Sequence, residues 1–110
     1  MTHPWVPEAG EIIWMGFDPQ AGHEQGGHRP ALVLSPAAYN RATGLLLCVP
    51  ITSKIKGYRF EVAITGAPAS VALADQVKSF DWRARGARRK GRAAEQELQA
   101  VRERARALIG

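Results

Sequence analysis

The sequence predicts an α+β fold that is mainly β: a small, SH3-like antiparallel β-barrel followed by a C-terminal helix. Three observations predict it. Short runs rich in apolar and β-branched residues alternate with Gly, Pro and Asn, as strands alternate with turns. The C-terminal segment instead repeats apolar residues at helical spacing. A chain of 110 residues has room for one core and hardly more, so residues 1–110 are expected to form a single domain.

The predicted strands occupy the first three quarters of the chain. They are Glu11–Phe17, Ala31–Leu34, Leu45–Ile51, Phe60–Ile64 and Val71–Val77. Between the second and third, residues 36–44 have room for one helical turn that Gly44 would end. Between the third and fourth, Lys56 and Gly57 fit a hairpin turn.

The segment Glu95–Leu108 predicts an amphipathic helix. The apolar residues that repeat at helical spacing are Leu98, Val101, Ala105 and Leu108. Glutamates near its start and arginines near its end match the direction of the helix dipole. This helix is expected to close the barrel.

Composition excludes several classes of protein. With 45% hydrophobic and 23% charged residues, the chain is too apolar to be disordered. No run approaches the roughly 18 apolar residues of a membrane span, and the start has no signal-peptide pattern, so we expect a cytoplasmic protein without a membrane partner. Cys48 cannot form an internal disulfide, and its apolar run predicts a small buried side chain. No metal or other cofactor is expected.

Positive charge is concentrated in the second half of the chain. Two arginines stand against four carboxylates in residues 1–50, a balance of −2, so the formal charge of +5 leaves +7 for residues 51–110. Within it, Lys78–Arg92 has seven positive residues against Asp81 alone. Such a run attracts polyanions, of which nucleic acid is the commonest. A solvated basic loop without a ligand explains the run equally well.

The segment Asp18–Pro30 is a long polar connection, and long loops in small domains are usually functional. It places Glu24, His28 and Arg29 among glycines, a set of groups able to close over an anionic substrate. It matches no nucleotide-phosphate motif, and His23 and His28 lack a third metal ligand. Length and polarity also fit a mobile surface connection, so these features alone leave the choice open.

Six segments in order carry a resemblance to a known family. They are Gly10–Pro19, Glu24–Pro36, Leu47–Ser53, Lys56–Phe60, Ala74–Ser79 and Trp82–Gly86. Together they resemble the MazF/PemK (Kid) toxins of bacterial type II toxin–antitoxin systems. The resemblance implies an SH3-like barrel that forms a homodimer and cleaves single-stranded RNA, such as mRNA, at short sequences without a metal, which stops translation and growth. It also implies a cognate, acidic MazE-type antitoxin that holds the toxin inactive.

The resemblance identifies Arg29 and Thr52 as the matched catalytic pair. Metal-free RNA cleavage uses the ribose 2′-hydroxyl as nucleophile, gives 2′,3′-cyclic phosphate and 5′-hydroxyl ends, and needs a base, an acid and a cation. A guanidinium grips phosphate through two hydrogen bonds, and a hydroxyl can donate beside it. Glu24 matches an acidic loop residue important in close relatives, and we expect it to be the base.

Other matched positions are candidates for RNA binding. They are Phe17, Gln25, His28, Ser53, Lys56, Asp75, Gln76 and Lys78. We expect Asp75 and Gln76 to read exposed bases or to hold the site in shape, because the Kid branch has an arginine where this chain has Leu73. Trp14 and Trp82 are expected in the core or in dimer packing, since strand aromatics are usually buried.

Three classes of function fit the predicted barrel, because fold alone does not determine function. The first is a sequence-specific endoribonuclease toxin, the second a toxin of the same fold that poisons DNA gyrase, and the third a non-catalytic RNA-binding or peptide-binding barrel. The first accounts for Arg29 and Thr52 at their matched positions, so it is the function that we predict.

Overall fold

Seven strands and two helices form the part of the chain that the computed structural model describes, residues 5–16, 28–66 and 68–110. The strands are β1 (Glu11–Gly16), β2 (His28–Val33), β3 (Leu45–Thr52), β4 (Glu61–Ile64), β5 (Ser70–Leu73), β6 (Lys78–Asp81) and β7 (Arg88–Arg92). The helices are α1 (Ala37–Thr43) and α2 (Glu95–Ile109). The mainly β fold with a C-terminal helix is confirmed.

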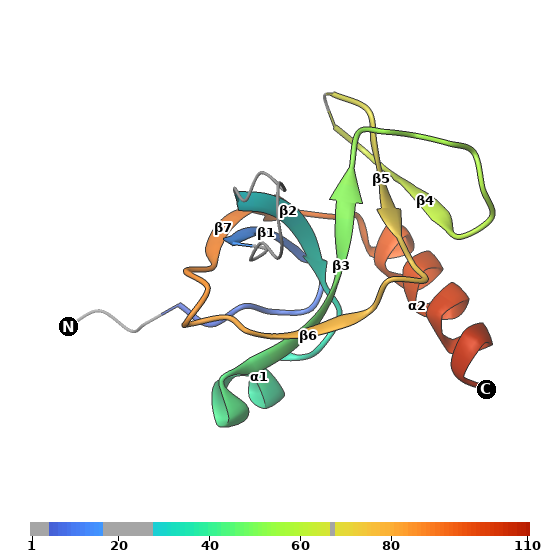
Figure 1. Cartoon of the computed structure of the whole chain (residues 1–110). Coiled ribbons are helices and arrows are strands. Elements are labelled where there is room, and N and C mark those ends of the chain that lie inside the picture. The colour runs from blue at the N-terminus through green and yellow to red at the C-terminus, as the bar shows by residue number, and fades with distance from the viewer. Residues whose placement is uncertain (1–4, 17–27, 67) are drawn as a thin grey trace, which may run out of the picture.

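The strands form one curled antiparallel sheet in the order β4-β5-β3-β2-β1-β7, and β6 also pairs with β3 (Figure 1). β3 is the strand that joins the two halves of this sheet. Residues 45–48 of β3 pair with β6, whereas Ile51 and Thr52 pair with β5. Two strands therefore follow one another along β3, and the chain between them turns beside the middle of β3, between Cys48 and Ile51.

The strands β6 and β7 were not predicted from the sequence. Both lie in the basic run, and most of their side chains are exposed. They are strands because their backbones pair with β3 and β1, which the alternation of apolar residues does not reveal.

Two turns also differ from the prediction. β5 ends at Leu73, and the amide of Gln76 donates to the Leu73 carbonyl at 3.0 Å, so Asp75 and Gln76 lie in a turn and not on a strand. The hairpin predicted at Lys56 and Gly57 is wrong, because β5 lies between β3 and β4 in the sheet. Residues 53–60 form a longer connection that crosses from one side of β5 to the other.

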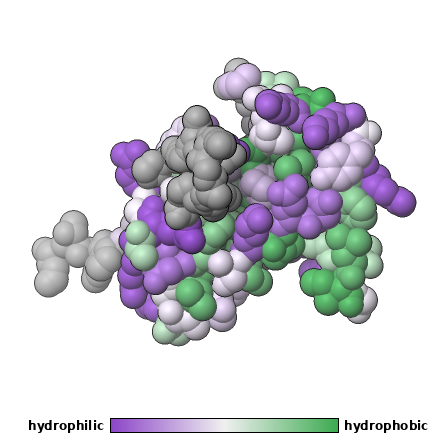
Figure 2. Space-filling view, in the orientation of Figure 1, coloured by the Kyte–Doolittle hydropathy of each residue, from purple (hydrophilic) through white to green (hydrophobic). Residues whose placement is uncertain are grey.

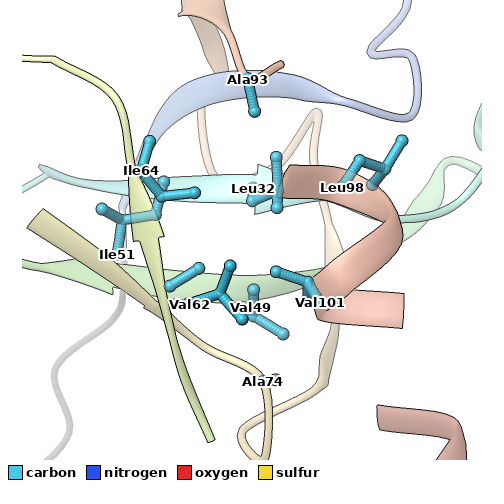
Figure 3. Packing of buried hydrophobic residues seen from close by; sticks show 10 residues of the cluster. Leu32, Val49, Ile51, Val62, Ile64, Ala74, Ala93, Leu98 and Val101 are labelled. Atoms are coloured by element: carbon cyan, nitrogen blue, oxygen red, sulfur yellow. The ribbon is translucent and has the colours of Figure 1, made fainter. Parts of the chain in front are cut away.

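The helix α2 covers one hydrophobic cluster of the sheet. Side chains from β2, β3, β4 and α2 point toward one another in this cluster (Figure 3). Leu98, Val101 and Ala105 are buried as predicted, but Leu108 is 55% exposed because the last turn of α2 extends beyond the sheet. Within the described residues, neither helix has the length and apolar character needed to cross a membrane.

A buried carboxylate anchors the N-terminal segment to the sheet. Glu11 at the start of β1 is only 3% exposed. One of its oxygens accepts hydrogen bonds from the Trp5 indole at 3.2 Å and the Glu8 amide at 2.9 Å, and the other lies 3.0 Å from Arg89 Nε. Because a buried charge is costly unless several donors satisfy it, these contacts form one structural unit.

Candidate active site

A cationic pocket of about 270 Å³ opens beside the last three residues of β3. The first of them, Pro50, pairs with β2, and the other two, Ile51 and Thr52, pair with β5. The residues that line it are Arg29, Pro50, Ile51, Thr52, Lys54, Lys56, Tyr58, Glu61, Leu73, Gln76 and Lys78. Hydrophilic residues gather on the surface around the β3–β4 connection (Figure 2). Four cationic side chains against one carboxylate make this pocket suited to an anionic ligand.

Arg29 and Thr52 come to the pocket from neighbouring strands. Ala31 of β2 lies opposite Pro50 of β3 in an antiparallel register. Continued by two residues, the same register sets Arg29 level with Thr52, and both side chains line the pocket. Arg29 thus belongs to β2 and not to the predicted loop, and a strand holds a functional side chain more firmly than a loop does.

The hydroxyl of Thr52 is oriented by the chain that follows it. Its Oγ1 accepts a hydrogen bond from the Lys54 amide at 3.0 Å. A hydroxyl has one proton to donate besides the lone pairs that accept, so this bond leaves the Thr52 proton available to a ligand. Thr52 is half-buried, while Arg29 and Lys54 are exposed. The arrangement favours Thr52 as a hydrogen-bond donor at the pocket wall.

Two side chains fix the connection between β3 and β4. The carboxylate of Glu61 accepts the amide of Lys56 with one oxygen and that of Gly57 with the other, both at 2.8 Å. The hydroxyl of Tyr58 donates to Asp75 Oδ1 at 2.8 Å. This hydrogen bond to Asp75 raises the pKa of Tyr58 above its ordinary value, because it favours the neutral phenol.

A second pocket, of about 530 Å³, adjoins the first and shares Ile51 and Thr52 with it. Ser53 lines this second pocket. Trp14 also lines it and is only half-buried, with the Lys90 ammonium 5.1 Å from its ring centre. The first expected position of Trp14, in the core, is therefore wrong, and the second, in dimer packing, stays a prediction. Trp82 is buried in a hydrophobic cluster, as predicted.

Residues 8–109 match the family model described as "PemK-like, MazF-like toxin of type II toxin-antitoxin system". The chain belongs to this toxin family. It is 55% identical over 111 residues to the "Endoribonuclease toxin MazF" of Escherichia coli (strain K12), an alignment that covers 100% of both chains. The crystal structure of MazF (Form-I) from Deinococcus radiodurans matches with a TM-score of 0.88 and 50% identity, covering 97% of this chain and 99% of that one. A structure of MazE-MazF (Form-II) from the same organism matches with a TM-score of 0.90 and 50% identity, covering 97% and 98%.

The cationic pocket of this PemK-like toxin unites part of the site predicted from the sequence. It brings together Arg29, Thr52, Lys56, Gln76 and Lys78. Ser53 faces the adjoining pocket, and Asp75 bonds Tyr58 beside the pocket without lining it. Phe17, Glu24 and Gln25 lie outside the described residues, as does the side chain of His28.

Sequence reasoning missed three polar residues that line the toxin's pocket: Lys54, Tyr58 and Glu61. Tyr58 stands inside the matched segment Lys56–Phe60, so the resemblance contained a signal for it. Lys54 and Glu61 flank that segment, and only the turning of the chain around Gly57 brings Glu61 back to the pocket.

The basic run of the toxin serves largely to hold the protein together. Arg83, Arg85 and Lys90 lie over the rings of Trp82, Phe80 and Trp14 at 4.7, 4.3 and 5.1 Å from the ring centres. Arg85 also donates to the Gly16 carbonyl, Arg92 donates to that of Ala9, and Arg89 pairs with Glu11. Lys78 is the member of the run that lines the cationic pocket. The charge of the run is therefore mainly structural, and the other cations of the pocket come from β2 (Arg29) and from the connection between β3 and β4 (Lys54 and Lys56).

Cys48 lies in the core of the toxin beneath Lys78, its partner in the register of β3 and β6. Burial raises the pKa of its thiol to about 12, against the opposing charges of Lys78 and Arg85. At neutral pH the thiol is therefore neutral and shielded, so the prediction of a buried hydrophobic role is confirmed. Within the described ranges, no three His, Cys, Asp or Glu side chains are grouped so as to hold a metal ion.

Proposed function

We propose that the chain cleaves single-stranded RNA in the cationic pocket, with the ribose 2′-hydroxyl as nucleophile and with Arg29 and Thr52 on the scissile phosphate. The chain is an endoribonuclease toxin of a type II toxin–antitoxin system, as shown by its family and by its 55% sequence identity to the Escherichia coli MazF toxin over the full length. The observation that supports the proposed site is that Arg29 and Thr52, from adjacent strands, line one pocket with three lysines.

In the proposed reaction, the 2′-oxygen attacks the neighbouring phosphorus as its proton passes to a base. The bond from phosphorus to the 5′-oxygen breaks, and that oxygen takes a proton. The products are a 2′,3′-cyclic phosphate and a 5′-hydroxyl end. Negative charge grows on the phosphoryl oxygens in between, and donors placed in advance stabilise it most. Arg29 would grip these oxygens through two N–H groups, and the Thr52 hydroxyl would donate a further hydrogen bond.

The general base and the base-reading groups belong to the same proposal. Glu24 is the proposed base, and Glu24→Gln is expected to remove the acidic limb of the pH–rate profile. The cations Lys54, Lys56 and Lys78 would bind flanking phosphates, because they line the pocket beside Arg29. The amide of Gln76 would bind the edge of an exposed base.

The proposed partners are a second copy of the chain and an acidic MazE-type antitoxin, since a related toxin has been solved with MazE. We place the toxin in the cytoplasm. An acidic antitoxin segment would compete with RNA for the cationic pocket. Its affinity is expected to fall as salt rises, and less steeply than that of RNA, because apolar contacts are not screened by salt.

The test of the proposed site compares Arg29→Ala with Arg106→Ala, which removes the same charge from the exposed end of α2. Each protein is incubated with a long RNA in EDTA, and the ends of the fragments are analysed. Wild type and Arg106→Ala are expected to give fragments with 5′-hydroxyl ends, and Arg29→Ala none. Cleavage by folded Arg29→Ala at the wild-type rate, or fragments with 5′-phosphate ends, would contradict the proposal.

A further inference from the structure

We infer that Glu61 is a positioning residue for RNA binding, which holds Lys56 at the cationic pocket by binding two consecutive backbone amides. The inference rests on the proposed function, because it assumes that the pocket binds RNA phosphates. Its basis is the geometry of the connection 53–60, which supplies Lys54, Lys56 and Tyr58 to the pocket.

The carboxylate of Glu61 holds the backbone of the connection through two consecutive amide groups. Its two oxygens accept the amides of Lys56 and Gly57, each at 2.8 Å. Hydrogen bonds to a charged acceptor are roughly twice as strong as neutral ones. Gly57 makes the turn possible, since its φ of +83° is a backbone conformation that L residues rarely adopt. Glu61 itself begins β4, where it lies opposite Leu73 of β5, so the carboxylate is attached to the sheet.

A second contact holds the same connection from the other side. The Tyr58 hydroxyl donates to Asp75 in the turn after β5, and the Tyr58 carbonyl accepts the Glu61 amide at 3.0 Å. With Glu61 bound to the amides before Tyr58, the chain is fixed on both sides of Gly57. This contact supports the second of the two roles expected for Asp75, which is to hold the site in shape.

The other hydrogen bonds of the connection hold its two ends rather than Lys56: the Lys54 amide donates to Thr52 Oγ1 at 3.0 Å, and Arg104 Nε donates to the Arg59 carbonyl at 3.1 Å. None of residues 53–59 belongs to a hydrophobic cluster, and all are exposed. The Lys56 ammonium makes no hydrogen bond or ion pair with any of the described residues, so it is available to a ligand. A lysine on an unrestrained loop would lose backbone and side-chain freedom on binding phosphate, whereas here the backbone is already ordered. Glu61 thus lowers the entropic cost of binding a phosphate at Lys56.

The sign of the effect separates positioning from simple electrostatics. Glu61 is the one carboxylate among the described residues of the pocket wall, so removing its charge should strengthen RNA binding if only long-range charge mattered. If Glu61 positions Lys56, Glu61→Gln should weaken binding, because an amide offers one acceptor oxygen and turns a donor toward the other backbone N–H. Glu103→Gln is the matched control, since Glu103 is an exposed glutamate on α2 whose side chain forms no bond within the described residues.

The experiment is a double-mutant cycle with Lys56→Ala, read as RNA affinity in an Arg29→Ala background and as single-turnover cleavage in the wild-type background. Glu61→Gln should weaken RNA binding about tenfold in the presence of Lys56 and less than about twofold in its absence. The slope of log affinity against log salt concentration should become shallower by a similar amount in Glu61→Gln and in Lys56→Ala. It should become no shallower in the double variant. Glu103→Gln should leave binding unchanged or slightly stronger.

Equal losses with and without Lys56, or tighter binding in Glu61→Gln, would overturn the inference. Thermal unfolding shows whether Glu61→Gln is folded, and hydrogen exchange shows whether the amides of residues 56 and 57 have lost protection. We expect a folded variant in which only these two amides exchange faster. Global unfolding of Glu61→Gln would also overturn it, since Glu61 would then support the whole fold. The proposed function fails separately, when wild type does not cleave or Arg29→Ala still does.

Discussion

Replacing Thr52 by valine isolates the catalytic value of one hydroxyl group. Valine keeps the β-branch and the shape of threonine, and so preserves the packing of β3 against β5. In the folded protein Thr52 Oγ1 accepts only the Lys54 amide among the described residues, at 3.0 Å, and Lys54 is exposed. Water can replace the lost acceptor, so Thr52→Val should cost less than about 1 kcal/mol of folding free energy.

The expected catalytic loss is much larger than the loss of stability. If the Thr52 hydroxyl donates to a phosphoryl oxygen that gains charge in the transition state, Thr52→Val should lower the rate of cleavage by about 10²–10³-fold, which corresponds to about 2.7–4 kcal/mol. Thr52→Ser keeps the hydroxyl and loses only the methyl group. It should therefore stay within about tenfold of wild type.

Single-turnover cleavage of an end-labelled RNA in EDTA, with enzyme in excess, measures the chemical step for both variants. Thermal unfolding followed by tryptophan fluorescence measures their stability. Cleavage by folded Thr52→Val within a few-fold of wild type would refute the assignment of the hydroxyl. Equal defects in Thr52→Val and Thr52→Ser would mean that the methyl group and the packing of β3, rather than the hydroxyl, govern the rate.

Three further predictions follow from the buried and hydrogen-bonded groups. In a Tyr39→Phe background, absorbance titration should find the pKa of Tyr58 above that of free tyrosine, and Asp75→Asn should lower this pKa. Because the pKa is raised in the folded state, the contact stabilises the fold below the free pKa, and this stabilisation is lost as pH rises through the folded-state pKa. Identical titrations with and without Asp75→Asn would contradict the prediction. Cys48 should react with a thiol reagent at neutral pH only after denaturation, so rapid labelling of the native protein would disprove its burial. Glu11→Ala should lower the free energy of unfolding by about 2–4 kcal/mol, because it leaves buried donors unpaired, and a denaturant midpoint equal to that of wild type would show that the carboxylate is dispensable.

Elements set by local chemistry were predictable from the sequence. The strands β1 to β3 follow apolar and β-branched runs, α1 ends at Gly44 in the left-handed conformation, and α2 follows the spacing of Leu98, Val101 and Ala105. Arg29 and Thr52 were predicted through matched motifs, and both line the cationic pocket. In each case the determining residues are close neighbours in the chain, so a local pattern contains the information.

Only the tertiary structure decided the features that depend on distant segments. The strands β6 and β7 carry exposed charged residues and exist because β3 and β1 offer them backbone partners far away in the sequence. From the sequence, the basic run fitted a polyanion-binding surface and a solvated loop equally well, whereas the structure places its arginines over aromatic rings and beside Glu11. Glu61 is one ordinary glutamate in the sequence, and its carboxylate reaches two backbone amides only after the chain turns at Gly57. Hydrogen bonds and ion pairs of this kind require atoms within about 3 Å of each other, and spacing along the chain does not determine that distance.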